Sequence, residues 1–174
     1  MSRTHWKLLP PLPAEQITTA GIHPLVLQLL HNRGVTQASQ FESFLRADKV
    51  LQGDPFLLPD MPQAVGRIYR ALLSGEKIAI YGDFDADGIS ATALLVQGLS
   101  ALGGRVIPYI PHRLQEGYGL KVAALEKLRK RGVTLVITVD CGITAASEVK
   151  EARKIGLDII ITDHHLPTTP LPPA

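Results

Sequence analysis

Residues 77–88 read Lys-Ile-Ala-Ile-Tyr-Gly-Asp-Phe-Asp-Ala-Asp-Gly, and this stretch decides the fold. Its first five residues, Lys77–Tyr81, form a short apolar run with β-branched side chains, which predicts a buried strand. Three carboxylates follow that strand, at Asp83, Asp85 and Asp87. Open parallel sheets bind ligands outside the carboxyl ends of their strands, so the acidic run stands where such a site is expected.

From this strand onward, the apolar residues switch repeatedly between the period of a strand and the period of a helix. We predict strands over 77–81, 106–110, 134–139 and 158–161, and helices over 88–102, 120–131 and 143–155. A glycine follows each predicted helix, as is common at helix ends. This alternation is typical of a Rossmann-like α/β domain, a parallel sheet with flanking helices and right-handed connections.

The chain before this region predicts a small helical N-terminal segment. Apolar residues between Leu25 and Leu30 recur with helical spacing, and a second short helix is expected over 37–45. Residues 7–15 are rich in proline and predict an extended segment. A further amphipathic helix over 61–73 opens the α/β region. The predicted units are a helical extension over 1–60 and an α/β domain over 61–174.

Composition excludes several classes of protein. The chain has 174 residues, 45% of them hydrophobic and 20% charged, which fits one globular core. No apolar run approaches the roughly 18 residues that span a bilayer, and the N-terminus lacks a secretory signal. The single cysteine, Cys141, excludes an internal disulfide and fits a reducing compartment, so we expect a cytoplasmic protein. A net charge of +2 neither indicates nor opposes binding to nucleic acid.

Two other predicted strands also end in candidate metal ligands. Asp140 follows the third strand, and Asp163, His164 and His165 follow the fourth. The carboxyl ends of parallel strands share one edge, so these residues are expected to converge with the acidic run. Mixed carboxylate and imidazole ligands suit manganese, magnesium or iron, and divalent ions relieve the repulsion between the carboxylates.

Each residue also has a structural alternative. Asp87 could cap the following helix, and Asp140 could be a turn residue. The run at 83–88 matches the opening of an EF-hand loop, but the twelfth position is Leu94 instead of a bidentate Glu, and a strand precedes it. The sequence also lacks a glycine-rich nucleotide loop and a Walker-type lysine. The crowding of polar groups at several strand ends favours the metal site.

The segment after the second strand could hold substrate. Residues 111–119 carry Arg113, which can grip a phosphate, and glycines that permit close backbone approach. A solvated turn is the alternative interpretation. The predicted helix over 120–131 is basic, and such a run of charges usually marks only a solvent-exposed face. Tyr118 could stack on a base, whereas packing is the expected role of Trp6. No partner pattern accompanies Cys141, so a thiol nucleophile is not expected.

Taken together, three segments resemble the first three motifs of the DHH phosphoesterases. They are residues 81–88, residues 139–142 (Val-Asp-Cys-Gly) and residues 162–165 (Thr-Asp-His-His). Residues 113–120 (Arg-Leu-Gln-Glu-Gly-Tyr-Gly-Leu) and 54–61 narrow the resemblance to the RecJ-type single-stranded-DNA exonucleases within that family. The resemblance is tightest from about residue 50 to residue 167.

The resemblance implies a two-metal nuclease that uses Mn²⁺ or Mg²⁺ and degrades single-stranded DNA from its 5′ end during repair or recombination. Carried over by position, it implies metal ligands at Asp85, Asp87, Asp140 and His164, catalytic residues at Asp83, Asp140 and His165, and substrate contacts at Arg113, Gly117, Tyr118, Gly119 and His165. Asp83 would support the cluster, and His165 would contact the scissile phosphate. Single-stranded DNA is the expected partner, with repair or replication proteins as further ones.

The resemblance also implies a fourth aspartate motif and a second domain with a glycine-rich histidine motif, neither of which residues 1–174 contain. We therefore expect the DHH domain to be incomplete at its C-terminus and the chain alone to be weakly active or inactive. Two alternatives stay open. One is a phosphodiesterase of the same family acting on cyclic dinucleotides or short oligonucleotides. The other is a non-catalytic repair or replication scaffold, which the intact ligand set disfavours.

Overall fold

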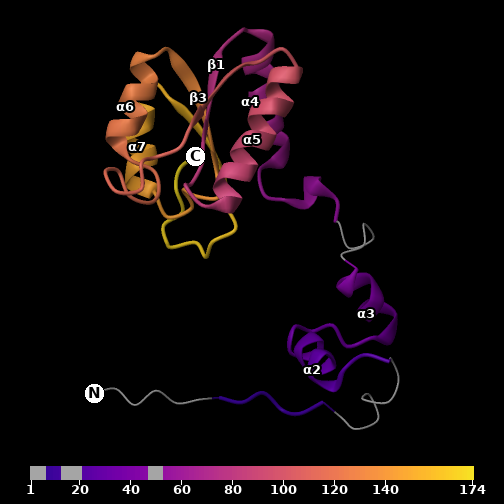
Figure 1. The fold of residues 1–174 in the computed structure, drawn as a ribbon. Coiled ribbons are helices and arrows are strands. Elements are labelled where there is room, and N and C mark those ends of the chain that lie inside the picture. Colours follow the sequence, from indigo (N-terminus) through magenta and orange to yellow (C-terminus); the bar gives the residue numbers. More distant parts are fainter. Residues whose placement is uncertain (1–6, 13–20, 47–52) are drawn as a thin grey trace, which may run out of the picture. The chain divides into compact units, whose positions relative to one another are not determined.

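A computed structural model describes residues 7–12, 21–46 and 53–174, and its chain divides into two compact units, Met1–Pro59 and Asp60–Ala174 (Figure 1). Trp6 and residues 13–15 of the proline-rich segment lie outside the described residues. Whether the two units correspond to the predicted functional division at residue 60 stays a prediction.

The first unit contains the helices α2 (Pro24–Asn32) and α3 (Ala38–Leu45) and a 3₁₀ turn, η2 (Pro55–Leu57). Its small core consists of Leu12, Leu27, Leu30 and Phe41. The amide side chain of Gln28 ties residues 7–12 to α2, because it accepts from the backbone N–H of Leu12 at 2.6 Å and donates to the carbonyl of Pro10 at 3.1 Å. The predicted helical N-terminal segment is therefore present.

The second unit is an α/β domain built on a parallel sheet. Its elements are α4 (Met61–Leu73), β1 (Lys77–Tyr81), α5 (Ala86–Ala101), β2 (Arg105–Tyr109), α6 (Val122–Lys130), β3 (Val133–Val139), α7 (Ala146–Lys154) and β4 (Asp158–Thr162). The strands pair in the order β2-β1-β3-β4, and every pairing is parallel. The predicted fold class, a parallel sheet with flanking helices, is confirmed.

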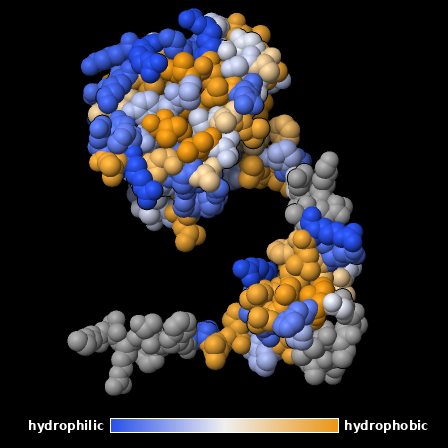
Figure 2. All heavy atoms as spheres, in the orientation of Figure 1, coloured by the Kyte–Doolittle hydropathy of each residue, from blue (hydrophilic) through white to orange (hydrophobic). Residues whose placement is uncertain are grey.

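Helices cover both faces of the sheet (Figure 1). Successive side chains of β1 point to opposite faces, so Ile78 and Ile80 pack with residues of α4 and α5, whereas Ala79 and Tyr81 pack with residues of α6 and α7. Figure 2 shows hydrophilic residues crowding the α6 side of this unit, with apolar and neutral residues more frequent on the α5 side. The two central strands, β1 and β3, are buried on both faces, which explains their nearly continuous apolar sequences.

The strand order places a topological switch point between β1 and β3. The chain leaves β1 through α5, on one face of the sheet, to reach β2, and returns through α6, on the other face, to reach β3. Ligands bind in the crevice that such a reversal opens at the carboxyl ends of the strands. The fold therefore directs attention to the residues that follow Tyr81 and Val139.

The amino ends of three strands are joined by a network of charged side chains. Arg67 on α4 donates to Glu76, just before β1, at 2.7 Å and to Asp158, the first residue of β4, at 2.6 Å. The hydroxyl of Thr134 on β3 donates to the same Glu76 carboxylate at 2.5 Å. This edge of the sheet is held by mutually satisfied partners.

Observed and predicted bounds agree within one or two residues, except that α7 begins at Ala146 instead of residue 143. Residues 143–145 form a turn in which the Ala145 N–H donates to the Gly142 carbonyl at 2.9 Å and the Ile143 N–H donates to Asp163 at 3.0 Å. A tertiary contact has overridden the helical pattern here. In the described part of the chain, no helix is both long and apolar enough to cross a membrane.

Candidate metal centre

The loop after β1 is compressed against the first turn of α5. A Cβ atom added to Gly88 would lie 2.5–2.7 Å from the backbone N, O and Cα atoms of Asp83, a distance that only glycine permits. A Cβ atom at Gly82 would lie 2.1 Å from the Thr92 hydroxyl of α5. The two glycines of the motif therefore let the acidic loop fold onto the helix.

This compression places two carboxylates at the end of β1. Asp83 is only 4% exposed, and its carboxylate accepts from the Phe84 N–H at 2.7 Å. Asp85 is the N-cap of α5, where its carboxylate accepts from the Gly88 N–H at 3.0 Å. A helix N-terminus has a partial positive charge, which favours a carboxylate side chain at this position.

Asp140 reaches the same edge from the end of β3 in a strained conformation. Its φ is +61°, in the left-handed region that costs a non-glycine residue about 1–2 kcal/mol. The ladder between β3 and β4 holds the residue there, because the Asp140 N–H donates to the Thr162 carbonyl at 3.0 Å. Such strain is characteristic of functional positions, and here it turns the carboxylate toward the β1 loop.

The loop after β4 contributes two histidines. Nε2 of His164 lies 2.9 Å from Oδ1 of Asp140, and Nδ1 of His165 lies 2.7 Å from Oδ1 of Asp163. The Asp163 side chain is only 1% exposed. It thus supports the loop from within, whereas the two imidazoles are open to solvent.

These residues form two overlapping groups of metal-ligating atoms. Ligand atoms of Asp83, Asp85 and Asp140 lie within 4.8 Å of one another, and so do those of Asp140, His164 and His165. Asp140 belongs to both groups. Two neighbouring ligands of an octahedral ion with bonds near 2.1 Å stand about 3 Å apart. The 2.9 Å separation of Asp140 and His164 fits that requirement.

The electrostatics of the centre also fit a cation. Burial raises the pKa of Asp140, and the nearby charge of Asp85 raises it further, against the opposing effect of His164. Burial alone would raise the pKa of Asp163, but hydrogen bonds from Ile143 and His165 hold it below its usual value. The hydrogen bond to Asp163 in turn raises the pKa of His165. A divalent ion would relieve the repulsion at Asp140.

Not every predicted ligand joins these groups. Asp87 is exposed in the first turn of α5 and belongs to neither group among the described residues. Asp83, to which the resemblance assigned a catalytic and supporting role but not metal ligation, lies in one of the groups. The geometry thus favours Asp83 over Asp87 as a ligand, and the role of Asp87 stays a prediction.

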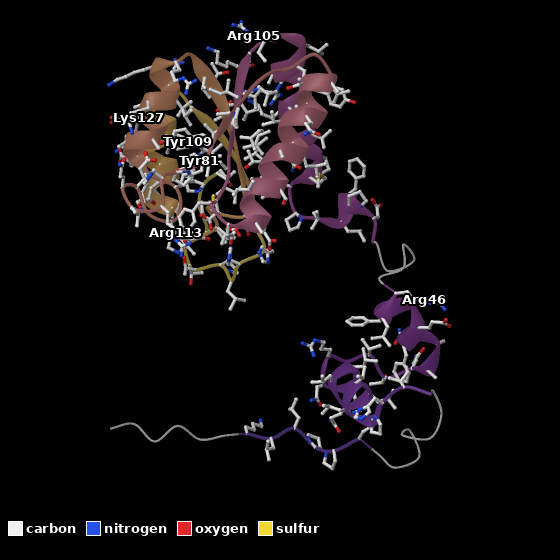
Figure 3. All side chains as sticks on the ribbon, in the orientation of Figure 1. Arg46, Tyr81, Arg105, Tyr109, Arg113 and Lys127 are labelled. Atoms are coloured by element: carbon white, nitrogen blue, oxygen red, sulfur yellow. The ribbon has the colours of Figure 1, made fainter. Side chains whose placement is uncertain are left out.

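The loop after β2 is fixed beside the centre. Glu116 accepts from the Tyr109 hydroxyl at 2.6 Å and from the His112 N–H at 2.8 Å, and the Tyr81 hydroxyl donates to the Gly119 carbonyl at 3.1 Å. Figure 3 shows Tyr81 and Tyr109 together inside the unit, where their rings stack 5.0 Å apart. These contacts hold both ends of the loop and leave its middle free to meet a ligand.

Two of the predicted substrate residues project from this loop toward the motif residues. The Arg113 guanidinium lies 5.1 Å from the centroid of the Phe84 ring, in the acidic loop. The Tyr118 hydroxyl lies 3.4 Å from Nδ1 of His165. Gly117 and Gly119 flank Tyr118 with φ values of +71° and +80°, which glycine adopts without strain. Arg113 projects at the end of the unit opposite Arg105 (Figure 3).

A hollow of about 140 Å³ adjoins the centre, lined by Tyr118, Lys121, Gly142, Thr144 and Glu148 among others. A larger one of about 450 Å³ lies along α7 and the C-terminal residues. Cys141 is fully buried between these elements, and burial raises the pKa of its thiol to about 12. The thiol is therefore protonated near neutral pH and unsuited to nucleophilic attack, as the sequence predicted.

The arrangement of these strand ends agrees with a comparison against protein families. The model of the DHH family, N-terminal domain, matches residues 77–174, from the start of β1 through all three motif segments. The chain belongs to the DHH family. The DHH domain of this chain thus carries its candidate metal-ligating side chains at the switch point of the sheet.

Curated relatives of this chain include the single-stranded-DNA-specific exonuclease RecJ of Bacillus subtilis, which is 41% identical over 174 residues. That match covers 98% of this chain and 22% of the relative. The protein of the same name from Thermus thermophilus is 36% identical over 177 residues, 98% of this chain and 25% of the relative. The chain therefore spans about a quarter of the length of these relatives.

Solved structures agree with this assignment. The structure of RecJ in complex with Mn²⁺ from Thermus thermophilus superposes with a TM-score of 0.67 at 32% identity, covering 97% of this chain and 24% of that one. A structure of exonuclease RecJ bound to manganese superposes with a TM-score of 0.60 at 45% identity, covering 64% of this chain and 29% of that one.

The sequence did not reveal the supporting roles of three residues. Gly88 was quoted only as part of a motif, yet its missing side chain lets the acidic loop form. Glu116 fixes the loop after β2, and no spacing rule could pair it with Tyr109. Asp163 was counted among the strand-end ligands but faces inward. In the sequence, the supporting role of Asp163 was indicated only by its position directly before two histidines.

Proposed function

We propose that this chain is the metal-binding portion of an exonuclease that hydrolyses the phosphodiester bonds of single-stranded DNA from the 5′ end. One observation carries the proposal: Asp83, Asp85, Asp140 and His164 come from three strands and meet with ligand spacing at the switch point. The names of the curated relatives, single-stranded-DNA-specific exonucleases, support the substrate class. The activity is assigned to DNA repair and recombination.

Mn²⁺ or Mg²⁺ suits the donor set, because hard carboxylate oxygens dominate it. The solved relatives bound to Mn²⁺ and Mg²⁺ support the same choice. When bound as a pair, such ions lower the pKa of coordinated water and stabilise the charge that develops on phosphoryl oxygens. Asp83, Asp85, Asp140 and His164 would hold these ions.

The chain's other residues would bind and orient the DNA. His165 is an exposed imidazole in the group that also contains Asp140 and His164, and it is assigned to the scissile phosphate. Arg113 can donate two parallel hydrogen bonds to a neighbouring phosphate, and its contact with Phe84 places it at the acidic loop. Tyr118 offers a partly exposed ring on which a base can stack. Stacking tolerates any base, which fits a nuclease without sequence preference.

The cytoplasm is the proposed location. The free, buried Cys141 supports a reducing compartment, and single-stranded DNA is produced there during repair in bacteria, the source of the curated relatives. Repair or replication proteins that generate single strands are the proposed protein partners.

The proposal is tested with the full-length gene product on single-stranded DNA labelled at either end. Release of nucleotides from the 5′ end that requires Mn²⁺ or Mg²⁺ and is lost in Asp140→Ala supports it. Cleavage in excess chelator, or unchanged cleavage by the variant, refutes it. Turnover of a cyclic dinucleotide in preference to long DNA would assign the protein to the alternative phosphodiesterases. Failure to bind Mn²⁺ in calorimetry would favour the scaffold.

A further inference from the structure

The two adjacent histidines of the DHH motif use different ring nitrogens. His164 directs Nε2 at Asp140, 2.9 Å away, whereas His165 directs Nδ1 at Asp163, 2.7 Å away. The two rings lie 4.6 Å apart with their planes tilted by 37°. Neighbours in sequence with the same side chain are therefore held in different orientations, and the difference comes from the partner of each ring.

The hydrogen-bond partner of His165 is the buried carboxylate of Asp163. Asp163 accepts three hydrogen bonds: from Nδ1 of His165 at 2.7 Å, from the His165 backbone N–H at 3.1 Å, and from the Ile143 backbone N–H at 3.0 Å. Its side chain is only 1% exposed. Asp163 also belongs to neither group of metal-ligating atoms among the described residues. Its carboxylate is directed inward, at groups of this chain.

An ionised carboxylate can only accept hydrogen bonds, so the ring nitrogen that faces it must carry the proton. Nδ1 of His165 is therefore the N–H nitrogen, and Nε2 is the nitrogen left for an external group. The Tyr118 hydroxyl also approaches Nδ1, but at 3.4 Å it is much the weaker contact. A carboxylate that orients the ring of a functional histidine is a recurring device in enzymes and metal sites.

We infer that Asp163 is a positioning residue: it holds His165 with Nδ1 protonated and thereby reserves Nε2 for the substrate phosphate or an ion. The same carboxylate binds the turn at Ile143, which follows directly on the segment of Asp140. It thus fixes the DHH loop relative to the strand end that supplies Asp140. The catalytic consequence rests on the proposed nuclease function, whereas the assignment of the ring nitrogens does not.

The ring assignment is tested by nitrogen NMR of the metal-free 174-residue chain labelled with ¹⁵N-histidine, with the His165 signals assigned by comparison with His165→Gln. The expected result is the form of neutral His165 with the proton on Nδ1. A predominant Nε2–H form in the unsubstituted chain overturns the inference, whether or not any variant folds.

Asp163→Ala supplies the second test. The inference expects the His165 signals to move toward the Nε2–H form, because the carboxylate that accepts from Nδ1 at 2.7 Å is gone. Asp158→Ala, at the opposite end of β4, is the matched control for loss of a strand-terminal carboxylate and should leave the His165 signals in place. Unchanged His165 signals in folded Asp163→Ala, or equal shifts in both variants, contradict a positioning role.

In the full-length gene product, Asp163→Ala should lower kcat on single-stranded DNA by about 10- to 100-fold with little change in KM, the usual cost of removing such a support. A loss confined to KM would contradict the inference. If the unsubstituted protein fails to cleave DNA at all, the proposed function fails, while the NMR result still decides the role of Asp163.

Discussion

The two edges of the parallel sheet are built from the same three strands but treat charge in opposite ways. At the amino edge, Arg67 forms hydrogen-bonded ion pairs with Glu76 and Asp158. At the carboxyl edge, Asp83, Asp85 and Asp140 converge, and the ion pairs that the described residues form there are with histidines, not with lysine or arginine. The first edge is satisfied by the chain itself, and the second has an excess of negative charge.

This difference separates stability from function within one sheet. Paired groups at the amino edge hold the starts of β1, β3 and β4 together. At the carboxyl edge, repulsion between the carboxylates and the left-handed backbone conformation of Asp140 both lower the stability of the fold. A bound cation would offset this loss. Unpaired like charges and backbone strain, which lower stability, are tolerated mainly at functional sites. The carboxyl edge, which contains both, is therefore the edge assigned to metal binding.

Asp140→Gly should have the largest effect and should move metal binding and stability in opposite directions. The variant lacks the carboxylate that belongs to both groups of candidate ligands, so Mn²⁺ affinity should fall by more than the roughly 100-fold typical of losing a supporting residue. Glycine adopts a φ of +61° freely, so the free energy of unfolding without metal should be unchanged or higher by up to about 1 kcal/mol. Calorimetry with Mn²⁺ and urea unfolding check the two halves.

Asp140→Ala is the control that separates charge from backbone conformation. Alanine also removes the carboxylate but does not relieve the backbone strain, so its affinity for Mn²⁺ should match that of the glycine variant, while its stability should be lower. Equal stability of the two variants would show that the conformation at residue 140 stores no strain.

Arg67→Ala should do the reverse, lowering stability without weakening metal binding. It leaves Glu76 and Asp158 without their cation, and the Arg67 side chain is only 16% exposed, so a loss of about 2–3 kcal/mol in the free energy of unfolding is expected. Lys154→Ala breaks an exposed pair with Glu151 in the same unit and should cost under about 0.5 kcal/mol. If urea unfolding shows that Arg67→Ala and Lys154→Ala lose similar amounts of stability, the Arg67 network contributes no more than an exposed surface ion pair.

The sequence predicted the carboxyl edge well and the amino edge not at all. Strand periodicity gives the order of the elements, and the rule that parallel strands share an edge brings Asp140 to the acidic loop. The contact of Arg67 with Asp158 joins residues 91 positions apart, and no spacing rule connects them. An edge that binds an external ion leaves a concentration of unusual residues in the sequence, whereas a satisfied network leaves ordinary ones.

The choice among the three aspartates of the loop could not be made from their spacing. Asp83, Asp85 and Asp87 alternate as residues on one face of a strand would, which makes them look equivalent. The chain changes from extended to helical at Ala86, so the third carboxylate falls on the helix and lies outside the group. The loop before this change packs closely on Gly88, where an added Cβ would meet backbone atoms of Asp83.

Gly88→Ala tests this contact and should damage both properties of the carboxyl edge. Its Cβ would overlap backbone atoms of Asp83, which cannot move as a flexible side chain can, so a loss of about 1–3 kcal/mol in stability and weaker Mn²⁺ binding are expected. Gly98→Ala in the same helix meets no atom within 4 Å and should stabilise the unit by about 0.5–1 kcal/mol. Opposite signs in the two variants are the decisive result.

The smallest expected effect is the pH dependence of the amino edge. The hydrogen bond from Arg67 lowers the pKa of Glu76, and the Thr134 hydroxyl lowers it further, from an ordinary value of 4.5. A carboxyl with a lowered pKa in the folded state stabilises the fold fully above its ordinary pKa and loses that contribution as the pH falls through the lowered value. Glu76→Gln should therefore be less stable than the unsubstituted chain near pH 7, by on the order of 1 kcal/mol.

This deficit should shrink as the pH falls below about 4.5, because protonation then removes the same charge from the unsubstituted chain. Urea unfolding of both chains between neutral pH and pH 3 measures it. A deficit that stays constant across this range would mean that Glu76 acts through its shape and neutral hydrogen bonds. The amino edge would then owe its stability to packing, and the contrast in charge between the two edges would hold only for the metal centre.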